Sequence, residues 1–190
     1  LNRDNSTLEI TGEDFAVEDT AAVDQIFLAD KYGSTALLER QEDGSWTVNG
    51  KFTARHDAIN TLLATIKNIE VKSPVSKKAK KTVIKEMASR SVKVEIYQGE
   101  KKPEKVYYVG HATQGNLGTH MLLDGTEQPM IMHMPGFFGY LTTRYFAEER
   151  KWRGTELFAS SIDEIDHVKV EYNERPKESF EIKRRNDEWV

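Results

Sequence analysis

The fold is decided by residues 23–48, VDQIFLADKYGSTALLERQEDGSWTV, because this stretch is echoed later in the chain. Residues 165–190, IDHVKVEYNERPKESFEIKRRNDEWV, repeat in the same order its apolar alternation, its central apolar and basic run and its tryptophan. Repetition of this kind describes architecture before it describes chemistry. It predicts two copies of one structural unit, and it names no reaction.

The first copy predicts a three-stranded meander. Turn formers at Gly33 and Asp43-Gly44 separate apolar stretches that alternate with the two-residue period of strands, and Asn49-Gly50 follows as a tight turn. The chain then changes to helical spacing, with apolar residues at Ile59, Leu62, Leu63, Ile66 and Ile69. We expect this helix to cover one face of the meander.

The middle of the chain predicts a second meander with its own helices. Ser76 is placed to cap a helix whose buried side carries Ala79, Val83, Ile84 and Met87. Expected strands follow at residues 92–97, 105–109, 119–123 and 129–134, and a helix is expected from Phe138 to about Ala147.

The fold class is therefore α+β, with antiparallel meanders packed with helices in two lobes and the opening strand motif repeated at the C-terminus. The expected divisions are a polar tether at 1–22, a meander-plus-helix lobe at 23–72, a second α+β lobe at 73–160 and a truncated repeat at 161–190. Ser161 and Glu164 have the form of a capping box at the start of this repeat. Because the repeat stops at its tryptophan, we expect it to lack the covering helix and the natural protein to continue.

The composition excludes several classes of protein. With 190 residues, 31% charged residues and a net charge of -4, the chain has no overall attraction to nucleic acid. It has no cysteine, which excludes disulfides, thiol catalysis and zinc sites built on thiolates, and which suits an exported protein. No apolar stretch is long enough to cross a bilayer. The start at Leu1 and the polar residues after it lead us to expect an upstream membrane anchor.

The chain resembles an uncharacterised bacterial family, domain of unknown function 4340, found especially in Bacteroidetes. The resemblance rests on the Asp43-Gly44-Ser45-Trp46 turn and the apolar helix after it, and on Tyr107-Tyr108-Val109-Gly110, Gly118-Thr119-His120-Met121 and Trp152-Arg153. It extends over residues 23–190 and carries no catalytic signature. It implies an extracytoplasmic, membrane-anchored protein, and some relatives accompany transporter or gliding components of the envelope.

One segment is a candidate binding surface for a protein partner or for lipid headgroups. Methionine and aromatic side chains, which form adaptable apolar patches, cluster at Met132, Met134, Phe137, Phe138 and Tyr140. The alternative is that these side chains belong to the core, as methionine and phenylalanine usually do. Exposure in the structure decides between the two.

Three histidines, His111, His120 and His133, lie on or beside predicted strands and form a candidate metal site. If their imidazoles converge in one pocket, the protein is a candidate metal-dependent hydrolase. Against this, the sequence lacks the spacings typical of zinc enzymes, and ordinary strand histidines explain the positions equally well.

Three other motifs have simpler explanations than a ligand site. The glycine-rich residues 110–118 lack the ending of a phosphate-binding loop and fit a wide connection between strands. The run Lys77-Lys78-Ala79-Lys80-Lys81 fits the solvated face of the second helix, without the aromatics of a nucleic-acid site. Asp163, Glu164 and Asp166 suit helix capping and lack the spacing of a calcium loop.

From the sequence we expect a non-catalytic binding module of a membrane-anchored envelope protein, periplasmic and attached to the inner membrane. The expected partner is an envelope or transporter-associated protein, with no nucleic acid and no cofactor. A metal-dependent hydrolase is the alternative, and a purely structural spacer is a third possibility.

Overall fold

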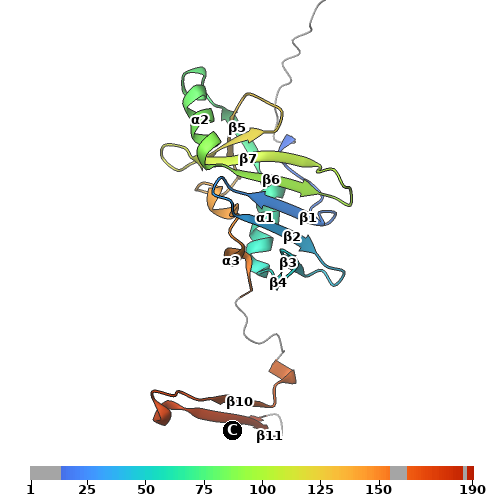
Figure 1. The fold of residues 1–190 in the computed structure, drawn as a ribbon, viewed down its shortest axis with the longest axis vertical. Helices are drawn as coiled ribbons and strands as arrows, with labels where there is room; N and C mark the ends of the chain where they lie inside the picture. The colour runs from blue at the N-terminus through green and yellow to red at the C-terminus, as the bar shows by residue number, and fades with distance from the viewer. Residues whose placement is uncertain (1–13, 155–161, 186–187) are drawn as a thin grey trace, which may run out of the picture. The chain divides into compact units, whose positions relative to one another are not determined.

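The computed structural model describes residues 14–154, 162–185 and 188–190, and the chain divides into two compact units (Figure 1). The first unit is Leu1–Gly154 and the second is Thr155–Val190. Both are built from antiparallel strands, and helices pack on the first. The predicted α+β class is confirmed.

A nine-stranded antiparallel sheet forms the first unit. Its strands are β1 (Gln25–Ala29), β2 (Thr35–Arg40), β3 (Trp46–Val48), β4 (Phe52–Thr53), β5 (Glu70–Pro74), β6 (Val92–Tyr97), β7 (Lys105–Ala112), β8 (Thr119–Leu123) and β9 (Met130–His133). They lie in the order β4-β3-β2-β1-β6-β7-β8-β9-β5. Where the sequence predicts separate lobes at 23–72 and 73–160, the structure has one sheet, because β1 pairs with β2 along one edge and with β6 along the other.

Helix α1 (His56–Asn68) covers one face of this sheet and lies behind β1 and β2 in Figure 1. Its predicted apolar stripe is confirmed, since Ile59, Leu62 and Ile66 are buried in one cluster with Ile26 and Leu38 of the strands. Burial of an aliphatic side chain of this size stabilises a fold by about 1.5–3 kcal/mol. This cluster, which extends from β3 to β9, is the main core of the unit.

Helix α2 (Lys77–Arg90) packs on the opposite face of the sheet. Its buried Val83 and Met87 contact Tyr108 of β7, whereas the neighbouring Tyr107 points into the main core. Successive strand residues point to opposite faces, so the two helices lie on opposite sides of β7. The predicted cap is also confirmed, because the Ser76 hydroxyl accepts a hydrogen bond from the Ala79 amide at 3.3 Å.

The described part of the predicted tether, residues 14–22, packs against the first unit. Phe15 and Val17 are buried in the main core, and the Val17 amide donates to the Ile66 carbonyl of α1 at 3.2 Å. The sequence predicts a polar tether here, but the apolar side chains of Phe15 and Val17 instead pack into the core. Residues 1–13 lie outside the described part.

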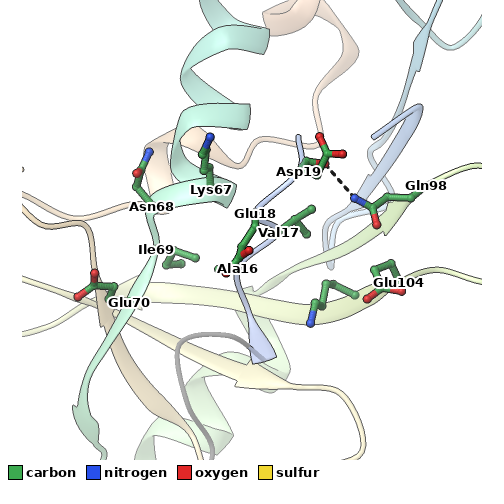
Figure 2. Close-up of a pocket in the computed structure, with 11 residues that line it drawn as sticks. Ala16, Val17, Glu18, Asp19, Lys67, Asn68, Ile69, Glu70, Gln98 and Glu104 are labelled. Carbon is green, nitrogen blue, oxygen red and sulfur yellow. Dashed lines mark hydrogen bonds between the residues drawn. The ribbon is translucent and has the colours of Figure 1, made fainter. Parts of the chain in front are cut away.

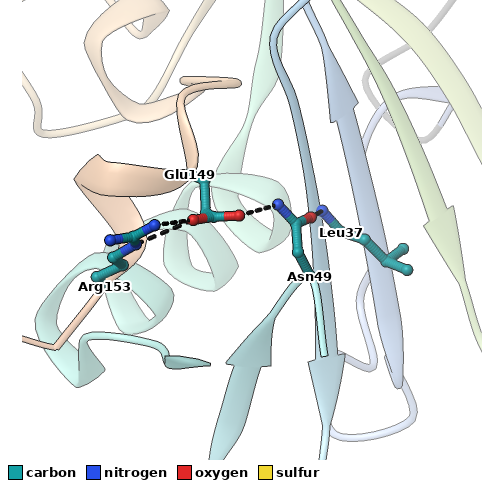
Figure 3. A network of polar contacts seen from close by, with 4 residues as sticks. All are labelled: Leu37, Asn49, Glu149 and Arg153. Atoms are coloured by element: carbon teal, nitrogen blue, oxygen red, sulfur yellow. Dashed lines mark hydrogen bonds and ion pairs between the residues drawn. The ribbon is translucent and has the colours of Figure 1, made fainter. Parts of the chain in front are cut away.

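A polar network joins the end of the first unit to its sheet (Figure 3). Asn49, in the left-handed region with a φ of 52°, accepts from the Leu37 amide at 2.8 Å and donates to Glu149 at 2.6 Å. Glu149 opens α3 (Glu149–Trp152) and also pairs with Arg153. The Arg153 guanidinium lies 3.7 Å from the ring of Phe52 in β4. The predicted turn at Asn49-Gly50 is thus fixed by α3.

The helix expected from Phe138 to about Ala147 is not formed, and only a 3-10 turn, η2 (Thr142–Arg144), occurs there. Contacts to the sheet hold the chain out of helical geometry. The Leu141 amide donates to the Thr119 hydroxyl at 2.7 Å, and the Thr142 hydroxyl donates to the Gly110 carbonyl at 2.8 Å.

The second unit is a three-stranded antiparallel sheet with two 3-10 turns. Its elements are η3 (Ile162–Glu164), β10 (His167–Val170), η4 (Pro176–Glu178), β11 (Phe180–Arg185) and β12 (Glu188–Trp189), and the strand order is β10-β11-β12. The predicted cap residue Ser161 lies outside the described residues.

The echo of residues 23–48 reappears as matching hydrogen bonds in the two meanders. The Arg40 amide donates to the Asp24 carbonyl at 2.8 Å, and the Arg184 amide donates to the Asp166 carbonyl at 2.8 Å. Each arginine also faces a tryptophan on the next strand, Trp46 in the first copy and Trp189 in the second. The copies differ in burial, because the face that α1 covers in the first copy is only partly buried in the second.

Candidate functional site

Two large apolar side chains are exposed near the end of β9. The side chain of Phe138 is 92% exposed and that of Leu117 is 55% exposed. Both line a small pocket of about 200 Å³. We call this region the Phe138 surface, and it consists of Lys72, Leu117, His133, Met134, Pro135, Gly136, Phe137 and Phe138.

Glycines allow the tight course of the loop that carries Phe138. Gly136 has a φ of 75°, a conformation that favours glycine, and the Phe137 amide closes this turn on the Met134 carbonyl at 3.1 Å. A Cβ atom on Gly139 would lie 2.9 Å from the Phe137 ring. The Phe137 ring therefore folds back against its own loop, and Phe138 is directed outward.

Arg144 anchors this loop to the body of the first unit. Its guanidinium lies 4.1 Å from the centre of the Phe137 ring, a cation–π arrangement. The same group donates to the Thr65 hydroxyl of α1 at 2.9 Å and lies 3.8 Å from the Met134 sulfur. The exposed ring of Phe138 is thus presented by a loop that Arg144 holds against the first unit.

The five predicted binding residues have different environments. Met132 is fully buried in the core, and Met134 and Phe137 are partly buried against it, as the core alternative predicts. Tyr140 is half-buried, and Phe138 alone among them is highly exposed. The segment therefore contributes to both the core and the surface. Side chains along strand β9 alternate between the two faces of the sheet, whereas those in the loop after it follow no such alternation.

Two residues of the Phe138 surface were missed from the sequence. Leu117 is the single large apolar residue in the glycine-rich connection, which was itself a usable signal. Lys72 is far away in sequence, and its ammonium group donates to the Leu117 carbonyl at 3.3 Å. Only the pairing of β5 with β9 brings Lys72 to this end of the sheet.

The glycine-rich residues 110–118 comprise the end of β7, which runs to Ala112, and the connection from there to β8, as the simpler explanation predicts in part. A Cβ atom on Gly110 would lie 2.9 Å from the Met87 side chain, and one on Gly118 would lie 2.7 Å from Ile131. These two glycines permit close packing of α2 and β9. Gly115 and Asn116, both with positive φ, form the turn itself.

Two of the three candidate histidines, His111 and His120, lie close together, and His111 also contacts a glutamate. The ring centres of His111 and His120 are 4.6 Å apart, and His111 Nε2 lies 2.7 Å from Glu86 Oε2 on α2. Within the described ranges, no three or more His, Cys, Asp or Glu side chains are arranged to hold a metal ion. His111, His120 and His133 therefore do not form the candidate metal site, and the metal-dependent hydrolase receives no support.

The environment of His120 predicts an acid-sensitive junction between α2 and the sheet. Burial lowers the pKa of His120 below its ordinary value of 6.5, and the charge of the neighbouring His111 is the second cause of this lowering. The unfolded chain therefore binds this proton more readily than the folded chain. Stability should fall as the pH drops from about 6.5 through the folded pKa, and it should level off below that pKa.

We expect His120→Gln to remove part of this pH dependence. The measurement is the urea midpoint of the wild type and the variant at pH values from about 8 to 5. His56→Gln, at an exposed position on α1, is the matched control and should retain the wild-type dependence. Equal losses of stability in the wild type and in His120→Gln would refute the assignment.

A separate hollow of about 620 Å³ lies elsewhere in the first unit (Figure 2). It lies where the last turn of α1 meets the segment before β1 and the start of β7. Its lining residues are Ala16, Val17, Glu18, Asp19, Lys67, Asn68, Ile69, Glu70, Gln98, Glu104 and Lys105. Gln98 crosses it to donate to the Asp19 carbonyl at 2.9 Å. Charges of both signs share the pocket, and no nucleophile paired with a base occurs among these described lining residues.

The acidic cluster of the second unit takes part in local structure. The Asp163 carbonyl accepts from the Arg184 guanidinium at 3.0 Å, and the Asp166 carbonyl accepts from the Arg184 amide. Glu164 ends the 3-10 turn η3. These contacts fix the turn before β10 through backbone carbonyls rather than through the acidic side chains.

Comparison with known proteins places the chain in a family. In the part of the chain that the structure describes, no helix combines the length and apolar character needed to span a membrane. Searches of the curated proteins and of the solved structures give no significant match. A family model, Domain of unknown function (DUF4340), matches residues 45–190. The matched residues include the Asp-Gly-Ser-Trp turn from Ser45 onward, α1, β7, β8 and the strands β10, β11 and β12 of the second unit. The chain therefore belongs to the DUF4340 family.

Proposed function

We propose that this protein is a non-catalytic binding module that contacts another protein through the Phe138 surface. The observation that carries the proposal is the 92% exposure of the Phe138 side chain on an anchored loop. Exposed apolar groups beside a pocket mark interaction sites, and a few aromatic residues contribute most of the binding energy at protein interfaces. Burial of this ring against a partner gains free energy without loss of any contact within the chain.

The shape and charge of the surface favour a protein partner. A pocket of about 200 Å³ is of the size that one apolar side chain fills, and Leu117 and Phe138 line it. Lys72 and His133 place polar groups beside the same pocket. An apolar centre with polar groups around it is the usual anatomy of a protein interface.

We also propose that the module works outside the cytoplasm, attached to the inner membrane, with an envelope or transporter-associated protein as its partner. Family resemblance and the absence of cysteine support this location. The check is labelling of the full-length protein in intact spheroplasts with a membrane-impermeant amine reagent. Protection of the chain until the cells are lysed would exclude the location.

Phe138→Ser tests the binding surface. We expect the affinity for the partner to fall by about 30-fold or more, the effect of losing an aromatic hot spot worth about 2 kcal/mol. The measurement is quantitative co-purification from cells that make the full-length protein, followed by titration of the partner identified. Because the ring is exposed, unfolding should change by less than about 0.5 kcal/mol.

Tyr32→Ser is the matched control. Tyr32 is also an exposed aromatic residue, at 79%, and it lies in the turn between β1 and β2. This variant should retain the wild-type affinity within about twofold. Equal retention of the partner by Phe138→Ser would overturn the proposal. So would an effect of Phe138→Ser on lipid vesicle binding alone, because the surface would then contact membrane rather than protein.

A further inference from the structure

Helix α2 is strongly basic. Its bases are Lys77, Lys78, Lys80, Lys81, Lys85 and Arg90, and its one acid is Glu86. Six bases and one acid give the helix a charge of +5. Since the whole chain carries -4, the remainder of the chain carries -9. The charge of the protein is therefore strongly divided between α2 and the rest.

The positive charge of α2 is not neutralised within the described part of the protein. None of its six bases lies within 4.0 Å of a carboxylate there, whereas Lys93, Lys151 and Arg153 elsewhere form such pairs. Glu86, the one acid of the helix, is engaged by His111 at 2.7 Å. The field of the helix therefore extends into solvent.

The bases are arranged in a row on the solvent side of the helix. Val83 and Met87 turn the apolar side toward the sheet, and Lys77, Lys81 and Lys85 are exposed. At intervals of four residues these three span about 12 Å along the helix axis. Like charges at this spacing destabilise a helix by about 0.2–0.5 kcal/mol per pair. Folding therefore does not explain the row, and an anionic partner does.

We propose that the basic face of α2 binds the headgroups of anionic phospholipids at a bilayer surface. Lysine ammonium groups are point charges that suit a plane of phosphates, and each contributes about 1 kcal/mol near such a surface. Nucleic-acid sites use arginines that bind bases through two hydrogen bonds and aromatic side chains on which bases stack. Helix α2 has one arginine and no aromatic residue, which favours lipid over nucleic acid. The negative remainder of the chain is repelled by the same surface and orients α2 toward it.

Vesicle sedimentation of the full chain tests the proposal. We expect binding to vesicles with about 30% phosphatidylglycerol, no binding to pure phosphatidylcholine, and release at about 0.5 M salt, because salt screens surface charges. The triple variant Lys77→Gln, Lys81→Gln, Lys85→Gln should weaken the partition coefficient by about 100-fold, from about 1 kcal/mol per lysine.

A second triple variant, Lys51→Gln, Lys101→Gln, Lys102→Gln, removes the same charge from exposed positions outside α2. It should bind anionic vesicles as the wild type does, and both variants should keep the wild-type melting temperature. An equal loss in the two variants would overturn the proposal, because net charge alone would then control binding. Binding of random-sequence DNA without binding of anionic vesicles would overturn it in favour of nucleic acid.

Discussion

Replacement of Trp152 by alanine should lower the free energy of unfolding of the first unit by about 3–5 kcal/mol. The side chain is fully buried in the main core, and its ring centre lies 4.2 Å from that of Phe146. Its Nε1 donates to the Phe146 carbonyl at 2.8 Å, and its own carbonyl accepts from the amide of Arg55, the residue that precedes α1. Alanine would leave a large cavity and would remove the donor to the Phe146 carbonyl.

Urea denaturation followed by far-ultraviolet circular dichroism measures this loss. Trp189→Ala is the control, because Trp189 lies in the second unit and is only partly buried. It should leave the main transition of the first unit unchanged. An unchanged urea midpoint for Trp152→Ala would show that the packing of α3 against the core is not as described.

Gly110→Ala should destabilise the first unit by about 1–3 kcal/mol, although it adds one methyl group. The added Cβ would lie 2.9 Å from the His120 carbonyl oxygen and 2.9 Å from Cγ of Met87. The methionine can move, but the backbone of β8 cannot move without disturbing the sheet. We therefore expect the packing of α2 on β7 to loosen.

Hydrogen exchange of the α2 amides reports this loosening, and urea denaturation reports the free energy. Gly154→Ala is the matched control, since its Cβ would have a nearest neighbour at 3.4 Å, an ordinary contact with the Thr53 carbonyl. Its effect should stay within about 0.5 kcal/mol. Wild-type stability and exchange in Gly110→Ala would contradict the close packing of α2 on β7.

Local patterns of the sequence predicted most of the elements. The alternation around Ile26 and Leu38 indicated β1 and β2, the stripe of Ile59, Leu62 and Ile66 indicated α1, and Ser76 indicated the start of α2. These signals depend on residues close together in the chain, which is why periodicity and capping detect them.

Contacts between distant residues could not be predicted in this way. Phe27 pairs with Leu37 across a short turn but also with Glu95, and this second pairing joins the two expected lobes in one sheet. The region from Phe138 has helical spacing, but hydrogen bonds from Leu141 and Thr142 to distant strands override it. Tertiary contacts decide both cases.

The candidate site was predicted only in part for the same reason. The sequence indicated a cluster of methionine and aromatic residues, but it did not separate the buried Met132 from the exposed Phe138. Exposure depends on the course of the loop, which Gly136 and the contact of Arg144 with Phe137 determine. Lys72 joins the site through the pairing of β5 with β9, which no local pattern of residues indicates.

Photo-cross-linking from position 138 tests the central claim most directly. A benzophenone amino acid is incorporated at position 138 or at position 32, which is also highly exposed, in the full-length protein, and cells are irradiated. The proposed function predicts a discrete cross-linked protein from position 138 that is absent from position 32. Equal yields from the two positions, or no protein product from position 138, would contradict the assignment of the Phe138 surface as a binding site.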